Sequence, residues 1–141
     1  MTEVEDELGI ADDEILLRRV KRDKPDMFKT DSATGLQRPS SAAFIVHDDG
    51  ISVYRNLILN NLGLIPQTIL APTEIVVSLT ATHVRECDGL EVKSDPWPRG
   101  IQDDHPEDAA HALIIGWRDL PRNRQKNHQR HLARSCVVLD T

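Results

Sequence analysis

The segment Arg38-Pro-Ser-Ser-Ala-Ala-Phe44 leads through His47-Asp-Asp-Gly50 into Ile51-Ser-Val-Tyr-Arg55. It places small hydroxylated residues, one bulky aromatic residue and two arginines around a short turn. An Asp-Gly pair between apolar runs is typical of a β-hairpin, because glycine readily adopts the positive φ that such turns require. We therefore expect two strands, at 42–46 and at 51–54, joined by this turn.

Outward from the hairpin, the chain predicts short strands and two main helices. Apolar and β-branched runs predict strands at 15–20, 74–84, 90–92, 112–116 and 136–139. The apolar residues of 56–64 predict a buried helix that ends at Gly63. Asp119 and Pro121 predict the start of a second helix, which continues to Arg134. The expected fold is a single compact α+β domain with a mixed or antiparallel sheet of about five or six strands.

Residues 23–40 show no clear periodicity and contain two prolines and a glycine. A loop of this length is unusual in a small domain, and such loops often carry function. Met27 and Phe28 are expected to attach the loop to the core. The region before the hairpin is therefore a place where binding residues are expected.

The composition is that of a soluble, acidic domain. Of the 141 residues, 39% are hydrophobic and 28% are charged, as in globular proteins, and the formal net charge is −6. This charge argues against general affinity for the phosphate backbone of nucleic acids. Residues 1–13 are acidic, and we expect them to form a flexible lead-in to a single domain at 14–141.

Several features of the sequence favour a cytoplasmic protein. Cys87 and Cys136 are the only cysteines, which fits a reducing compartment better than secretion. The first residues are acidic, whereas a signal peptide begins with a basic region. No apolar run approaches the ~20 residues that cross a bilayer, so we expect no membrane association.

Arg38, Ser40 and Ser41 form the strongest candidate for an anion-binding site. An arginine can hold a carboxylate or a phosphate through two parallel hydrogen bonds, and serine hydroxyls add further donors. The alternative is that the serines satisfy the backbone of a turn and that Arg38 pairs with an acid. Ser52 and Tyr54 share one side of their predicted strand. They would therefore complete a polar cluster with the first group.

His111 comes directly before a predicted buried strand, where a strand-end site residue often lies. His105 lies close by in the acidic stretch 103–108, so a histidine–carboxylate site is chemically reasonable there. No metal-ligand spacing such as HExxH or paired CxxC occurs, and we expect no metal and no cofactor. Cys87 has Arg85 nearby, which would lower the pKa of the thiol, but nothing else marks Cys87 as a nucleophile.

The predicted helix at 118–134 is unusually polar and basic. Its basic residues are Arg118, Arg122, Arg124, Lys126, Arg130 and Arg134, against the single acid Asp119. A helix that is polar on all sides is either highly exposed or completed by a partner. Because the whole chain is acidic, we expect a solvated helix or an acidic protein partner rather than nucleic acid.

The chain contains, in this order, the segments Ile15-Leu-Leu-Arg-Arg-Val20, Arg38-Pro-Ser-Ser-Ala-Ala-Phe44, Ile51-Ser-Val-Tyr54 and His111-Ala-Leu-Ile-Ile-Gly116. Together these four segments resemble a family of small bacterial proteins without an assigned activity. The similarity extends over most of the chain in order and implies a bacterial or phage setting. In that family basic residues tend to follow the last glycine, whereas Trp117 stands before Arg118 here.

Two functions are consistent with these features. The leading hypothesis is a small cytoplasmic binding or accessory protein that acts through a protein partner on the basic helix. The alternative is an enzyme, either a hydrolase or a nucleotide-handling transferase. Such an enzyme would bind an anion with Arg38, use His111 as its acid–base group and use Ser41 or Ser52 as a supporting donor. This alternative predicts that Arg38, Ser52 and His111 converge on one cleft.

Overall fold

The computed structural model describes residues 10–21, 24–30, 32–46, 50–96 and 106–139. Its main sheet contains six antiparallel strands, in the spatial order β6 (Glu91–Ser94), β7 (His111–Ile115), β4 (Gly50–Arg55), β1 (Ile15–Lys21), β5 (Glu74–Thr80) and β8 (Val137–Leu139). A separate antiparallel ribbon consists of β2 (Phe28–Thr30) and β3 (Gln37–Pro39). The expected α+β class is therefore confirmed.

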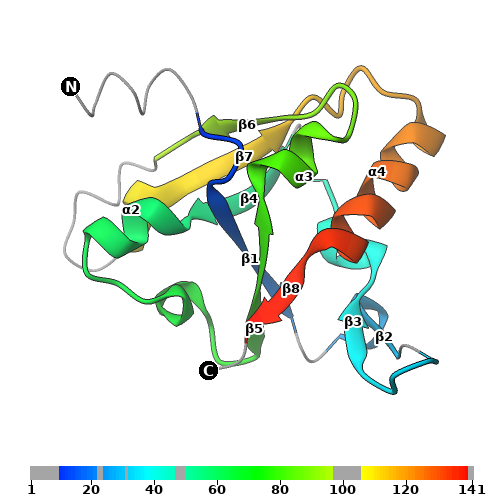
Figure 1. Ribbon diagram of the computed structural model, residues 1–141, viewed down its shortest axis with the longest axis horizontal. Coiled ribbons are helices and arrows are strands. Elements are labelled where there is room, and N and C mark those ends of the chain that lie inside the picture. The colour runs from blue at the N-terminus through cyan, green and yellow to red at the C-terminus, as the bar shows by residue number, and fades with distance from the viewer. Residues whose placement is uncertain (1–9, 22–23, 31, 47–49, 97–105, 140–141) are drawn as a thin grey trace.

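Three α-helices and four 3-10 helices connect the described strands. The α-helices are α2 (Asn56–Asn61), α3 (Ala81–Arg85) and α4 (Arg122–Ser135), and α4 lies beside the small ribbon (Figure 1). The 3-10 helices are Pro25–Met27, Ser41–Phe44, Pro66–Ile69 and Pro106–Ala110. No helix among the described residues combines the length and the apolar character needed to cross a bilayer.

The main sheet carries a hydrophobic core on each face. The larger core includes Leu16, Phe44, Val53, Ile114 and Leu132, and Met27 and Phe28 pack against it as expected. The smaller core includes Leu17, Tyr54, Leu59 and Val76. Successive residues of β1 and of β4 thus enter different cores, because side chains alternate between the faces of a sheet. Ile10, near the end of the predicted lead-in, is 4% exposed and belongs to the larger core.

The prediction of a strand at 42–46 is wrong, because Ser41–Phe44 forms a 3-10 helix. The Ser40 hydroxyl caps this helix by accepting a hydrogen bond from the Ala42 N–H at 3.2 Å. The turn directs the Phe44 side chain fully into the larger core. The second strand of the expected hairpin is confirmed as β4, while the turn residues 47–49 lie outside the described part of the chain.

The strand expected at 74–84 ends earlier, at Thr80. The Thr80 hydroxyl accepts a hydrogen bond from the His83 N–H at 3.4 Å, and His83 Nδ1 accepts one from the Thr80 N–H at 3.1 Å. This reciprocal capping box starts α3 at Ala81. Helix α4 also starts differently from expectation, since Pro121 and not Asp119 occupies its N-cap position.

Candidate functional site

A cleft of about 880 Å³ opens on the main sheet beside β4, β7 and β1. Ser52 of β4 and His111 of β7 both line it. The two residues project from the same face, because His111 is paired with Tyr54, and Tyr54 stands two residues after Ser52. The antiparallel pairing of β4 and β7 therefore brings together two polar side chains from distant parts of the chain.

Strands β1 and β4 diverge next to this pair of residues. They pair only at Leu16–Arg55 and Leu17–Tyr54, whereas β1 pairs with β5 over its whole length. Arg18 fills the gap, donating a hydrogen bond from Nε to the Ala43 carbonyl oxygen at 2.8 Å. Its Nη1 donates a second one to the Ser52 carbonyl oxygen at 2.9 Å. The guanidinium thus replaces missing strand pairing and holds a positive charge beside β4.

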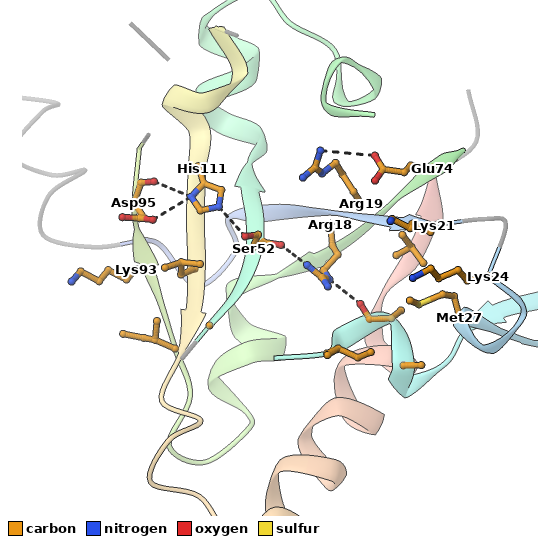
Figure 2. Close-up of a pocket in the computed structure, with 17 residues that line it drawn as sticks. Arg18, Arg19, Lys21, Lys24, Met27, Ser52, Glu74, Lys93, Asp95 and His111 are labelled. Carbon is orange, nitrogen blue, oxygen red and sulfur yellow. Dashed lines mark hydrogen bonds and ion pairs between the residues drawn. The ribbon is translucent and has the colours of Figure 1, made fainter. Parts of the chain in front are cut away.

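His111 is the best-fixed polar side chain of the cleft, with an exposed fraction of 1%. Its Nδ1 lies 2.9 Å from the Asp95 carbonyl oxygen and 3.3 Å from Asp95 Oδ2. Its Nε2 lies 3.0 Å from Ser52 Oγ. Tyr54 packs against the imidazole edge to face, with ring centroids 5.6 Å apart. Figure 2 shows Asp95, His111, Ser52 and Arg18 as one continuous row of interactions.

These contacts define the tautomer of His111. A carbonyl oxygen only accepts hydrogen bonds, so Nδ1 carries the hydrogen and donates it to Asp95. In the neutral imidazole Nε2 is then an acceptor, and the Ser52 hydroxyl donates to it. Burial lowers the pKa of His111 below its ordinary value, and the backbone and carboxylate of Asp95 offset part of that shift. The imidazole is therefore neutral near pH 7 and able to accept a proton from Ser52.

The cleft is positively charged, although the chain as a whole is acidic. Among its described lining residues, five basic side chains (Arg18, Arg19, Lys21, Lys24 and Lys93) stand against the carboxylates of Glu74 and Asp95. Arg19 pairs with Glu74 at 3.9 Å. Burial and the charge of Arg19 lower the pKa of Arg18 to about 10, so this guanidinium stays charged near neutral pH. A negatively charged ligand would find complementary charge here.

Only two of the three residues predicted for the enzyme site lie in the same cleft. Ser52 and His111 meet, but Arg38 lies in a different groove, next to α4, and donates a hydrogen bond from Nη2 to the Arg134 carbonyl oxygen at 3.1 Å. The expected convergence of Arg38 with the other two residues is therefore wrong. Tyr54 is buried beneath His111 and positions the imidazole, and it is not part of the cleft lining.

The other predicted binding residues also lie away from this cleft. Ser41 lines the same groove as Arg38, and Ser40 lines it while donating to the Asp26 carbonyl oxygen, so the Ser40 hydroxyl serves the turn. The basic residues of α4 are all exposed, namely Arg122, Arg124, Lys126 and Arg130. Arg124 pairs with Asp88 at 2.9 Å, and Arg130 donates to Asn127 at 3.2 Å.

Sequence reasoning missed Arg18 and Asp95. Arg18 had a detectable signal, because it shares a strand face with the buried residues Leu16 and Val20 and interrupts their apolar pattern. Asp95 follows directly after β6 and had no such signal, because its contact with His111 arises only from strand pairing.

Two further expectations concern cysteine and metal chemistry. The lowered pKa expected for Cys87 is wrong, since burial, together with the charge of Glu86, raises the pKa of this thiol to about 11. His105 lies outside the described residues. Within the described ranges, no group of three or more His, Cys, Asp or Glu side chains could hold a metal ion.

No protein-family model, curated protein or solved structure matches the chain. The resemblance noted in the sequence therefore stays a prediction.

Proposed function

We propose that the protein is a hydrolase that cleaves small anionic esters in the cleft between β1, β4 and β7. The observation that carries this proposal is the hydrogen bond from Ser52 to Nε2 of His111, in the tautomer that general-base catalysis requires. This hydrogen bond favours a hydrolase over a nucleotide-handling transferase, the other enzyme class expected from the sequence. A nucleophile, a base and a group that orients the base are the parts of a Ser–His–Asp site, which recurs on unrelated folds.

In the proposed reaction, Ser52 Oγ attacks the carbonyl carbon of the ester while His111 Nε2 takes the hydroxyl proton. The imidazolium that forms donates through Nδ1 to Asp95, whose carbonyl and carboxylate oxygens both lie within reach. The tetrahedral intermediate expels the alcohol, which receives the proton from Nε2. Water then hydrolyses the acyl-serine with the same base, releasing the carboxylic acid and restoring Ser52.

The charge of the cleft supports an anionic substrate. Arg18 donates to the backbone carbonyl oxygen of Ser52, so its positive charge lies beside the strand that carries the proposed nucleophile. Lys21 and Lys24 line the same cleft and would attract a carboxylate or phosphate carried elsewhere on the substrate. An ester with such a group is therefore the substrate class that fits best.

Paired chromogenic esters, which differ only by a carboxylate or a neutral amide on the acyl chain, test this proposal. We expect the wild-type protein to hydrolyse the carboxylate-bearing ester faster and Ser52→Ala to abolish the reaction. Ser78→Ala is the matched control, since Ser78 is a half-buried strand serine of β5 outside the cleft. Absence of hydrolysis by the wild type, or equal activity of the two variants, would overturn the proposal.

A second function, binding to a protein partner, is favoured by the exposed basic residues of α4. Acidic protein surfaces are complementary to such a helix, and the net charge of −6 makes nucleic acid a weaker match. In this proposal the protein also acts as an accessory subunit. A cytoplasmic setting in bacteria or phage-infected cells is part of the proposal, and it rests on the cysteine content and the sequence resemblance alone.

A further inference from the structure

Helix α4 and strand β3 enclose a second groove, of about 440 Å³, which is separate from the cleft of Ser52 and His111. Pro39 and Ala133 are buried at this groove and give it an apolar floor. Exposed basic residues form its rim: Lys29, Arg38, Arg130 and Arg134. Among the described residues that line the groove, none is acidic. The groove thus combines an uncharged floor with a positively charged rim.

The basic residues of the rim stand in pairs of like charge. Lys29 and Arg38 lie directly opposite each other in the ribbon, and Arg130 and Arg134 are one helical turn apart on α4. Like charges in either arrangement are destabilising. The C-terminal end of α4 offsets part of this repulsion on the helix, because helix dipoles favour positive charge there.

We propose that this groove binds an extended acidic segment of a protein partner. The inference rests on the proposed partner function and assigns it a surface and a ligand chemistry. Carboxylates of Asp and Glu side chains would neutralise the repelling cations, and arginine holds carboxylates bidentately. An extended segment fits between a strand and a helix. A nucleic acid fits less well, because its backbone would continue past the groove over a molecule with a net charge of −6.

Fluorescence anisotropy of a labelled peptide of Glu and Gly residues tests this inference on the full-length protein. A peptide in which Gln replaces Glu is the neutral control. We expect binding of the acidic peptide that weakens as salt is added, and no binding of the neutral one. Lys29→Glu combined with Arg134→Glu should weaken binding by at least about tenfold, since two favourable charge pairs become repulsive.

The matched control carries the same change of charge elsewhere on α4. Arg122 and Lys126 are basic residues of α4 that do not line the groove. If the groove and not the whole basic helix binds the peptide, Arg122→Glu combined with Lys126→Glu should change the affinity by less than about threefold. Equal losses in both double variants, or tighter binding of a single-stranded oligonucleotide than of the acidic peptide, would overturn the inference. Ser52→Ala should bind the peptide like the wild type. Failure of ester hydrolysis and failure of peptide binding are therefore distinguishable.

Discussion

Nε2 of His111 lies 3.0 Å from Oγ of Ser52, although 59 residues separate the two in the chain. The contact exists because β4 and β7 pair antiparallel and bring both side chains to one face of the sheet. On its far side, the imidazole is held by the backbone of Asp95 at the end of β6. Three strands thus fix a serine and a histidine at the edge of a cationic cleft, and this arrangement leads to five predictions.

The Asp95 carboxylate should matter less than the Ser52 hydroxyl. Ser52→Ala removes the nucleophile and should lower kcat by about 10³-fold or more. Asp95→Asn keeps the backbone carbonyl that accepts the Nδ1 hydrogen at 2.9 Å, so the tautomer persists and the loss should be about tenfold. Steady-state ester hydrolysis by both variants measures the difference. If Asp95→Asn is as inactive as Ser52→Ala, the carboxylate and not the carbonyl controls the tautomer.

Activity and stability should both fall as the pH is lowered below ~6.5, the ordinary pKa of histidine. Because burial lowers the pKa of His111 in the folded protein, the unfolded chain binds a proton that the folded chain does not. The contribution of His111 to the free energy of unfolding is therefore fully present above ~6.5 and is lost as the pH falls toward the lowered pKa.

Urea unfolding on both sides of this pH measures the effect. His111→Gln cannot titrate and should lose less stability on acidification than the wild type. The rate of ester hydrolysis should fall as the pH drops through the lowered pKa of His111 in the folded protein, since the protonated imidazole is no longer a base. An activity that rises on acidification would contradict the assignment of His111 as the base.

Arg18 should stabilise the fold more than its neighbour Arg19. Arg18→Ala leaves the carbonyl oxygens of Ala43 and Ser52 without their donors, which should lower the free energy of unfolding by about 2–4 kcal/mol. Arg19→Ala is the control, because the Arg19 side chain is 38% exposed and its contacts are a 3.9 Å ion pair with Glu74 and a cation–π contact with the Tyr54 ring. The control should lose less than about 1 kcal/mol. Equal losses in denaturant titrations would mean that Arg18 does not brace the diverging strands.

Gly116 should tolerate no side chain. Its φ is +108°, and an added Cβ would lie 2.1 Å from the Gly89 carbonyl oxygen, a backbone atom. Gly116→Ala should therefore lower the free energy of unfolding by about 3 kcal/mol or more. Gly63 has a φ of +76° but open space around its Cα, so Gly63→Ala should lose about 1 kcal/mol. Similar losses for both variants would show that the loop of Gly89 moves away from β7.

Much of the fold follows from local sequence patterns. The short apolar run of β1 and the apolar run of β7 predict strands, because both runs are too short for a helix and are bounded by polar residues or glycine. The 3-10 helix at Ser41–Phe44 is not predictable in the same way. It depends on the Ser40 cap and on α4, where Gln129 donates to the Phe44 carbonyl oxygen at 3.0 Å. The end of β5 is set by a capping box in which histidine takes the place of the usual glutamate or glutamine.

The sequence predicts a residue of the candidate site only where a polar residue interrupts an apolar strand. Ser52 and His111 are polar residues on apolar strands, so they were identifiable without a structure. Arg38 was assigned to the same site because it precedes a serine pair, yet the cleft takes its arginine from β1 instead. Asp95 joins the site through the pairing of β6 with β7, and strand register is not visible in a single sequence.

Covalent labelling of the native protein with a fluorophosphonate, which phosphonylates serines that a neighbouring base activates, tests the role of Ser52 most directly. We expect one adduct per chain in the intact mass spectrum, located on Ser52 by peptide mapping. The adduct should be absent from Ser52→Ala and strongly reduced in His111→Gln. A wild-type protein that stays unlabelled, or an adduct on another serine, would show that His111 does not activate Ser52.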